Sequence, residues 1–153
     1  MSSFSTKIKI QAPVEHVWSV LADTGNTDCW NPGVVESYVI TDQPTGLGAN
    51  RYCNLGGNNF LNEEVVTWEA EKRLTMRITD TNLPLHADIR FTLQADNEAS
   101  VVTVSPEYTV KYGPLGWLLD RFYVRSNYEK GMSALLAGLK EYIESDGDLD
   151  TSR

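Results

Sequence analysis

The longest helical pattern in the chain is residues 113–145, GPLGWLLDRFYVRSNYEKGMSALLAGLKEYIES. From Tyr128 onward, apolar residues recur at spacings of three and four, which places them on one face of an α-helix. These residues are Tyr128, Met132, Leu135, Leu136, Leu139 and Ile143. The opposite face is charged, and Lys140 and Glu144 on it can pair one turn apart. The apolar face needs a partner surface, so we expect the core to be built against this helix.

A stripe of small residues, Gly131, Ala134 and Gly138, runs between the two faces. A glycine inside a helix costs about 1 kcal/mol relative to alanine, so two glycines on one stripe require a reason. One interpretation is close packing of the helix on a strand or on another helix. The other is a helix surface kept small to leave room for a ligand.

The start of this helix has its own pattern. Ser126 and Glu129 have the S-x-x-E spacing of a capping box, which predicts that the main helix begins near Ser126. Residues 113–122 would then form a shorter helical piece with Pro114 near its first turn. The alternative is one long bent helix. After Ser145 the periodicity ends, and we expect residues 146–153 to be a frayed acidic tail.

Length and composition indicate one domain, at residues 1–145. A chain of 153 residues with 41% apolar residues can form one sizeable core but is too short for two ordinary domains. The 13 basic and 21 acidic residues give a net charge of −8, which disfavours nucleic acid and anionic membrane surfaces as partners. The oligomeric state stays open.

Cys29 and Cys53 lack the spacing and companions of a zinc site, and we expect two free thiols, which suits a reducing compartment. No motif indicates a cofactor or a metal, and we expect neither. The first residues contain no signal-peptide pattern, and no segment reaches a membrane-spanning length. We therefore expect a cytoplasmic protein without membrane insertion.

The pattern of the rest of the chain predicts strands, with two short helical pieces after the first strand. Residues 4–10 alternate as a half-buried strand does, and Pro13 then opens a short amphipathic helix. A turn-rich segment at 24–33 leaves room for one helical turn. Further strands are expected at 34–41, 49–55, 59–68, 73–79, 85–93 and 101–110, with Gly56-Gly57 in a tight hairpin and Pro106 at an edge or a bulge.

This order predicts an α+β fold. Hairpin connections make the sheet antiparallel, and the helices are segregated from the strands. A sheet of this many strands must twist and curl, and the apolar face of the C-terminal helix can occupy its concave side.

Several local sequences resemble the START-like superfamily, also called SRPBCC, and most closely its polyketide cyclase/dehydrase-like branch. They are IQAPVEHVW at 10–18, WNP at 30–32, GLGA at 46–49, EEVVTWE at 63–69 and GPLGWLLDR at 113–121. The resemblance implies a helix-grip fold, in which a curved seven-stranded antiparallel sheet surrounds a long C-terminal helix and leaves an apolar cavity. It also implies a hydrophobic small-molecule ligand such as a lipid, polyketide or quinone. Members share a cavity rather than one catalytic motif, so the resemblance leaves open whether this chain is an enzyme.

Catalytic candidates are few. His16 lies beside the apolar face of the first helix, and His86 lies opposite the apolar row of its strand, so we expect both to be exposed. Glu63 and Glu64 are neighbours on a strand and face opposite sides of the sheet, so they cannot share a proton. If Glu63 faces inward, it must pair with Arg51 or Arg77; the alternative is a salt bridge at the rim. Glu63 is the one weak catalytic candidate.

The expected ligand-binding residues gather where the cavity would open and along its walls. Trp30 is either an entrance gate or a tryptophan that closes the core, and Trp117 is a candidate for the other lip. Any buried tyrosine needs a partner for its hydroxyl. The full set is Trp30, Asn31, Arg51, Glu63, Tyr108, Trp117, Tyr128, Met132 and Leu135.

Three functions remain open on the sequence. The first is binding of a hydrophobic or amphipathic small molecule in a cavity of about 300 to 1,000 Å³ between sheet and helix. The second is an enzyme of the polyketide cyclase or dehydratase type that uses a cavity acid. The third is a protein-binding scaffold without a ligand.

Overall fold

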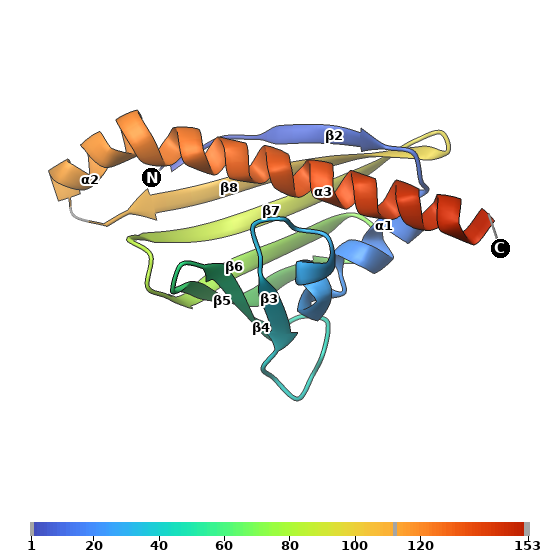
Figure 1. Ribbon diagram of the computed structural model, residues 1–153, viewed down its shortest axis with the longest axis horizontal. Helices are drawn as coiled ribbons and strands as arrows, with labels where there is room; N and C mark the ends of the chain where they lie inside the picture. Colours follow the sequence, from blue (N-terminus) through green and yellow to red (C-terminus); the bar gives the residue numbers. More distant parts are fainter. Residues whose placement is uncertain (1, 112, 152–153) are drawn as a thin grey trace.

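The strands pair into one antiparallel sheet, and the long C-terminal helix crosses one face of it (Figure 1). The computed structural model describes residues 2–111 and 113–151, without the side chains of Leu119 and residues 146–151. The strands are β1 (Ser2–Ser3), β2 (Thr6–Ile10), β3 (Glu36–Val39), β4 (Asn50–Gly56), β5 (Asn59–Glu69), β6 (Arg73–Thr81), β7 (Leu85–Asp96) and β8 (Ala99–Val110). The helices are α1 (Val14–Leu21), η1 (Thr24–Cys29), α2 (Gly113–Leu119), η2 (Asp120–Val124) and α3 (Arg125–Thr151). The predicted α+β class and helix-grip arrangement are confirmed.

The sheet has eight strands by hydrogen bonding, in the order β1-β8-β7-β6-β5-β4-β3, with β2 also paired to β8. β1 and β2 pair with β8 in one continuous register, from Ser2 opposite Tyr108 to Ile10 opposite Ser100. The break between them falls opposite Pro106, which has no N–H to donate to the ladder. The eight segments therefore make the seven strands that the sequence predicts, the first one interrupted.

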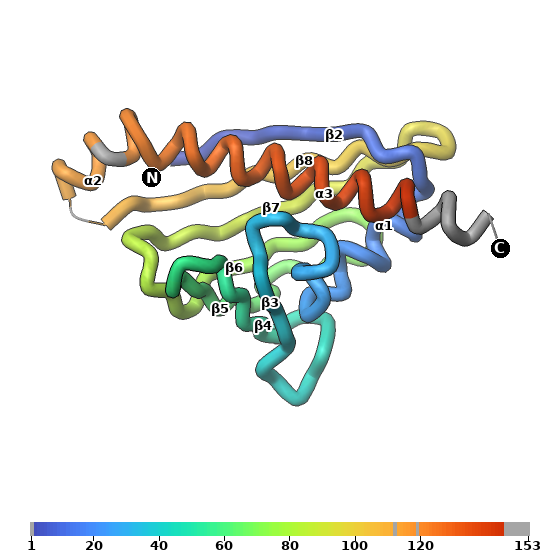
Figure 2. The backbone as a smooth tube through the Cα atoms, in the orientation of Figure 1, coloured from blue at the N-terminus to red at the C-terminus, as the bar shows by residue number. Residues whose placement is uncertain are grey.

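The path of the chain brings its first strands beside its last strand. After β2, α1 and η1 the chain runs to the far edge of the sheet at β3 and then returns strand by strand to β8, beside β2 (Figure 2). α3 packs against β2, β8 and α1. The helix therefore rests on one side of the sheet, and β4 to β7 curve away beneath it.

The part of α3 from Leu135 to Ile143 supplies the helix side of the core. Leu135, Leu136, Leu139 and Ile143 are all buried, as the spacing predicts. They lie in one cluster with inward residues of the sheet and with Val17, Trp18 and Leu21 of α1. In that cluster the Trp18 ring meets Trp68 edge to face at 5.1 Å.

Polar contacts fix the C-terminal half of α3 to the end of β2 and to the connection that follows it. Lys140 Nζ lies 2.8 Å from Glu144 Oε2, which confirms the expected pair, and it also donates to the Lys9 carbonyl at 2.8 Å. Glu144 Oε2 accepts from the Gln11 N–H at 2.9 Å. That N–H and the Lys140 ammonium group lower the pKa of Glu144. The helix is thus held by its apolar face and by a charged edge.

The segment before α3 is also helical. α2 leads through the π-helical turn η2 into α3, which corresponds to the bent-helix alternative, although α3 begins within one residue of the predicted Ser126. The predicted capping box is wrong. Because the chain is helical before Arg125, the first N–H groups of α3 need no side-chain cap, and Glu129 instead accepts from Arg125 Nε at 2.9 Å.

The predicted acidic tail falls mostly on residues that the structure does not describe in full. The backbone of α3 continues to Thr151, and residues 152–153 lie outside the described part. The frayed tail at 146–153 therefore stays a prediction. Among the described helices, none is both long and apolar enough to cross a membrane.

Two leucines one turn apart on α3 test the packing of the helix. Leu139 is fully buried in the core, whereas Leu135 borders the cavity described below. We expect Leu139→Ala to lower the free energy of unfolding by about 2 to 5 kcal/mol and Leu135→Ala to fall at the low end of that range, because fewer contacts are lost beside an existing space. Urea unfolding measures both. A larger loss for Leu135→Ala than for Leu139→Ala would contradict this placement of the core.

Candidate ligand cavity

A cavity of about 460 Å³ lies between the N-terminal half of α3 and the strands β4 to β7. Its sheet wall consists of side chains that alternate along neighbouring strands. Arg51, Cys53 and Leu55 of β4 lie on the same face as Leu61 and Glu63 of β5. The register explains this, because Arg51 is opposite Glu63 and Cys53 is opposite Leu61. Ile78, Ile89 and Phe91 extend the apolar wall across β6 and β7.

The helix wall begins in η2 and runs through the first turns of α3. It contains Tyr123 and Val124, followed by Asn127, Tyr128, Gly131, Met132 and Leu135. Tyr128, Met132 and Leu135 thus form part of one surface with Arg51 and Glu63. The same apolar stripe that is buried at Leu139 and Ile143 therefore faces an open space closer to the N-terminus of the helix.

The two helix glycines have different roles. A Cβ atom on Gly138 would lie 2.2 Å from the Trp30 carbonyl oxygen, so this glycine permits close packing of α3 on the loop after η1. A Cβ atom on Gly131 would have no neighbour within 4 Å, and Gly131 lines the cavity. The close-packing interpretation therefore holds at Gly138, whereas at Gly131 the room for a ligand stays a prediction. Ala134 between them is exposed.

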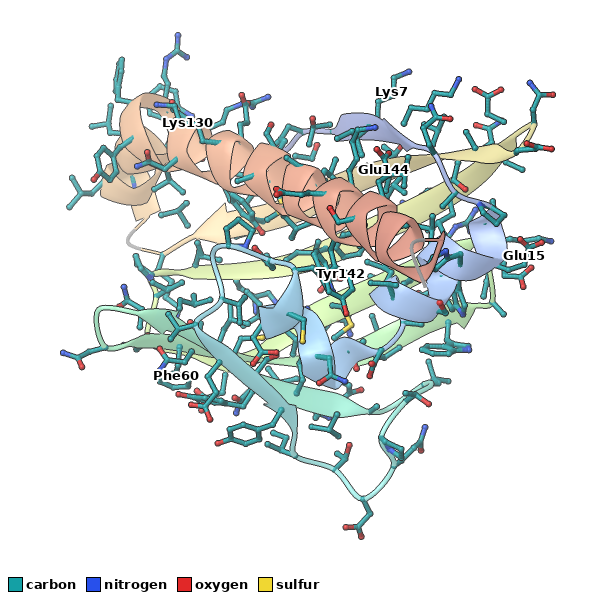
Figure 3. All side chains as sticks on the ribbon, turned by 45° about the vertical axis from the view of Figure 1, so that its right-hand side comes forward. Lys7, Glu15, Phe60, Lys130, Tyr142 and Glu144 are labelled. Carbon is teal, nitrogen blue, oxygen red and sulfur yellow. The ribbon has the colours of Figure 1, made fainter. Side chains whose placement is uncertain are left out.

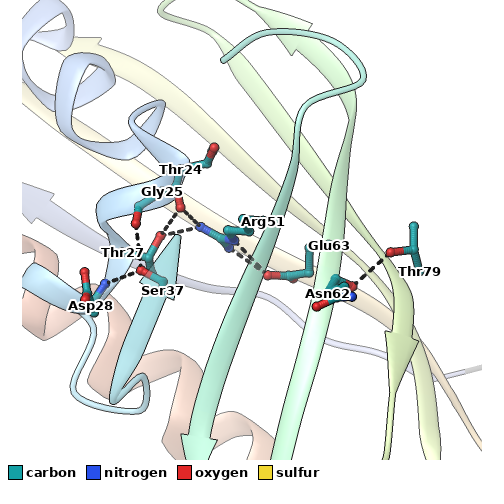
Figure 4. A network of polar contacts seen from close by, with 9 residues as sticks. All are labelled: Thr24, Gly25, Thr27, Asp28, Ser37, Arg51, Asn62, Glu63 and Thr79. Atoms are coloured by element: carbon teal, nitrogen blue, oxygen red, sulfur yellow. Dashed lines mark hydrogen bonds and ion pairs between the residues drawn. The ribbon is translucent and has the colours of Figure 1, made fainter. Parts of the chain in front are cut away.

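A buried ion pair forms the polar part of the sheet wall (Figure 4). Arg51 is 8% exposed and Glu63 is 3% exposed. Arg51 Nε and Nη2 both donate to Glu63 Oε1, at 3.0 and 2.8 Å. Of the two alternatives for Glu63, the structure therefore shows the inward pair with Arg51 and not the salt bridge at the rim.

The rest of the Arg51 guanidinium group is bound by η1. Nη1 donates to the Thr24 carbonyl oxygen at 3.1 Å and to the Thr27 hydroxyl group. Ser37 of β3 holds η1 in place, because its hydroxyl donates to the Gly25 carbonyl at 2.9 Å and accepts from the Asp28 N–H at 3.0 Å (Figure 4). Burial lowers the pKa of Arg51, but the neighbouring Glu63 outweighs it and the net change is upward. The cation is thus fully engaged by the protein.

Glu63 is engaged through one oxygen only. Both hydrogen bonds from Arg51 reach Oε1, and among the described residues none donates to Oε2. Since Glu63 lines the cavity, its carboxylate keeps hydrogen-bond acceptor capacity for a molecule inside it.

Tyr128 places a second polar group on the opposite wall. Burial raises the pKa of its phenol, and the negative charge of Glu63 adds to the rise. The ring packs against Phe4 and Tyr108, with centroids 5.4 and 5.0 Å away. The described residues provide no hydrogen-bond partner for the Tyr128 hydroxyl. The cavity therefore contains an unpaired phenol on the wall opposite the Glu63 carboxylate.

Three of the residues expected in the site do not line it. Tyr108 is buried beside Tyr128 and donates to Asp120 Oδ1, and burial together with that carboxylate raises its pKa to about 12. Trp30 lies in the core cluster, as a residue that closes the core would, and its Nε1 has no partner among the described residues. Trp117 is 59% exposed on α2, outside the cavity lining. Asn31, in contrast, does line the cavity.

The histidines and cysteines contribute little chemistry to the cavity. His86 is exposed as predicted, His16 is half-buried, and neither lines the cavity. Both cysteines are free, as expected, with Cys29 exposed and Cys53 buried. Cys53 faces the cavity, and burial raises the pKa of its thiol to about 11, which disfavours the reactive thiolate.

Sequence reasoning missed several lining residues. Among them are Gly33 after η1, Leu83 and Pro84 in the turn after β6, Leu85 at the start of β7, and Tyr123, Val124 and Asn127 at the start of the helix. Three distant segments meet there, so no single pattern marks them. The one local signal was Pro84 between two leucines, an apolar turn where a polar one is usual.

A curved antiparallel sheet that holds a C-terminal helix over an apolar cavity defines the START-like class of proteins. The chain belongs to the family described as "Polyketide cyclase / dehydrase and lipid transport", which it matches over residues 1–144. The resemblance read from the sequence is thus confirmed. No curated protein matches the chain.

Solved structures give the same fold. TTHA0849 from Thermus thermophilus superimposes with a TM-score of 0.79 at 19% identity, covering 95% of this chain and 99% of that one. The Zhui aromatase/cyclase from a Streptomyces species gives 0.79 at 16% identity, with 94% and 93% covered. A START superfamily protein from Mycobacterium smegmatis gives 0.74 at 13% identity, with 92% and 98% covered. Similarity at these identities establishes the fold.

The two glycines provide a matched pair of stability variants. We expect Gly131→Ala to raise the free energy of unfolding by up to about 1 kcal/mol, because helix propensity improves and the added methyl group enters open space. Gly138→Ala should lower it, because the methyl group would clash with backbone at Trp30. Urea unfolding of both variants checks this, and equal effects would contradict the two assigned roles.

The ion pair can be tested by removing one or both partners. Glu63→Leu leaves Arg51 buried without its anion, and we expect a loss of about 3 to 5 kcal/mol in the free energy of unfolding. The double variant Arg51→Met with Glu63→Leu should lose much less, since no charge then remains buried. Thermal and urea unfolding compare the two; a double variant as unstable as the single one would argue against a desolvated pair.

Proposed function

We propose that this protein binds a hydrophobic or amphipathic small molecule in the cavity between α3 and the sheet. The observation that carries the proposal is the unfilled space beside Gly131, in a cavity whose volume of about 460 Å³ lies in the range of small-molecule sites. A helix that only had to pack would gain stability from a larger residue at this position. Burial of apolar ligand surface, at about 25 cal/mol per Å², would supply most of the affinity.

The polar groups of the cavity indicate what the ligand presents. Glu63 Oε2 accepts a hydrogen bond, and the Tyr128 hydroxyl can donate or accept one. Arg51 is occupied by Glu63, Thr24 and Thr27, so it offers no free cation to an anionic ligand. These groups favour an apolar molecule that ends in an uncharged hydrogen-bond donor, such as an alcohol or a phenol, over a fatty acid. A carboxylate beside Glu63 would be repelled in a site of low dielectric constant.

An enzyme of the cyclase type is the second candidate. It is favoured by one observation, that Glu63 and Tyr128 face one cavity from opposite walls. A carboxylate and a phenol in that position could move protons while the walls hold a reactive chain folded. We rank binding first because it requires only the cavity, whereas catalysis also requires a correctly placed acid or base. No feature of the cavity favours the third function, a protein-binding scaffold without a ligand.

Paired ligands of equal chain length test the binding proposal. We expect dodecanol to bind at least about tenfold more tightly than dodecanoate, because only the alcohol can donate to Glu63 without charge repulsion. In Glu63→Gln this preference should shrink. Displacement of an apolar fluorescent probe measures both affinities, and native mass spectrometry of the purified protein detects a ligand already bound.

A blocking variant and its control locate the binding. Met132→Trp would fill the cavity and should abolish probe binding, while Ser133→Trp, on the exposed side of the same helix, should leave it unchanged. Probe binding that survives Met132→Trp would refute the cavity as the site. Turnover of a polyketide chain that Glu63→Gln suppresses, with probe binding retained, would instead support the enzyme.

A further inference from the structure

The helical segment that leads into α3, beside the cavity, exposes a group of large apolar side chains. We call it the terminal patch; it lies on α2 and η2 and consists of Leu115, Trp117, Leu118, Phe122 and Tyr123, each 45% to 74% exposed. Figure 3 shows side chains projecting from this end of the helical segment into open space. A group of large exposed apolar side chains on one segment is a candidate interaction site.

Polar groups and a glycine of this segment face the protein, and several of its large apolar side chains face solvent. Its inward face carries Gly116, whose Cβ would lie 2.2 Å from the Lys111 carbonyl oxygen, and Asp120, which accepts hydrogen bonds from Ser2 and Tyr108. Gly116 and the Asp120 carboxylate therefore face the protein. Val124 also packs on the core, whereas the five residues of the terminal patch remain exposed.

The charge around the terminal patch differs from that of the whole chain. Residues 111–130 contain four basic residues, Lys111, Arg121, Arg125 and Lys130, against Asp120 and Glu129. Their net charge is +2, which leaves −10 on the rest of a chain whose total is −8. Asp120 is turned inward, and Glu129 is paired with Arg125 at 2.9 Å. The Arg121 guanidinium lies over the rings of Trp117 and Phe122, 5.6 and 6.0 Å from their centroids.

We propose that the terminal patch docks on an anionic lipid surface. Tryptophan and tyrosine prefer the headgroup level of a bilayer, leucine and phenylalanine bury into the acyl boundary, and arginine and lysine attract anionic lipids. Repulsion from the acidic remainder is screened, because the Debye length at physiological salt is about 8 Å. The expectation from net charge, that anionic membranes repel the chain, thus does not apply at this end. The docking lies at the surface and crosses no bilayer.

The terminal patch adjoins the cavity, so docking would bring the cavity close to the lipid. Tyr123 belongs both to the terminal patch and to the cavity lining, and Val124 and Asn127 continue that lining on the same helical segment. A docked protein therefore brings the Tyr123 side of its cavity close to the lipid. The docking itself needs no ligand, so its test is independent of the proposed ligand binding.

Vesicle flotation with two matched variants tests the proposal. Leu115 and Leu47 are 61% and 63% exposed, the first in the terminal patch and the second in the loop between β3 and β4. With vesicles of phosphatidylcholine and phosphatidylglycerol we expect the unaltered protein and Leu47→Ser to float, and Leu115→Ser to lose about fivefold or more in partitioning. Arg121→Glu should lose at least about fivefold, and high salt should weaken all binding.

Tryptophan fluorescence gives a second readout. Of the four tryptophans only Trp117 is exposed, since Trp18 and Trp30 are buried and Trp68 is half-buried. Docking should therefore shift the emission of Trp117 to the blue, and brominated lipids should quench it. Trp117→Phe should remove both effects. Flotation that Leu47→Ser and Leu115→Ser reduce equally would overturn the location of the docking surface.

Two other outcomes would overturn the lipid proposal itself. One is that the protein floats with neither neutral nor anionic vesicles. The other is a dimer in analytical ultracentrifugation that Leu115→Ser dissociates while vesicles remain unbound, which would assign the terminal patch to contact between two copies of the chain. Folding of each variant is checked by urea unfolding, and the exposed positions predict stabilities close to that of the unaltered protein.

Discussion

The structure depends on one constraint, the close approach of α3 to the loop after η1 at Gly138. There the helix backbone nearly touches the Trp30 carbonyl oxygen, and no residue with a side chain fits. This contact and the buried Leu139 and Ile143 hold the C-terminal half of α3 on the sheet, while the N-terminal half passes over the curved strands β4 to β7. The cavity is the space that this geometry leaves. The helix packs tightly on the core through its C-terminal half and borders the cavity through its N-terminal half.

The polar interior follows from the same geometry. Arg51 and Glu63 lie opposite each other on β4 and β5, at the side of the cavity where η1 approaches. η1 supplies Thr24 and Thr27 to the guanidinium group, so the buried cation is satisfied by backbone and hydroxyl oxygens as well as by its anion. Because Arg51 uses only one oxygen of Glu63, the pair leaves an acceptor to the cavity. One contact thus serves both the fold and the candidate site.

Much of the fold could be predicted because its signals are local. The three-and-four spacing in α3 and the alternation along the strands depend only on neighbouring residues, and both are confirmed. The phase of each strand was not predictable, since Arg51 and Glu63 become inward only through pairing across the sheet and packing on η1. The capping box failed for a similar reason, because η2 already supplies a helical chain before Ser126. Trp117 is expected at the cavity only because it comes just before the long helix. In the structure Asp120 makes the inward contacts of that segment, and Trp117 is exposed.

Methyl NMR of the protein titrated with an apolar alcohol measures the central claim most directly, that the space under the first turns of α3 accepts a guest. If the cavity accepts the alcohol, shifts and ligand contacts will be confined to methyl groups that line it, such as those of Ile78, Ile89, Met132 and Leu135. Leu139 and Ile143, buried on the same helix outside the lining, should stay unchanged. Shifts spread evenly over both groups, or none at saturating alcohol, would contradict it.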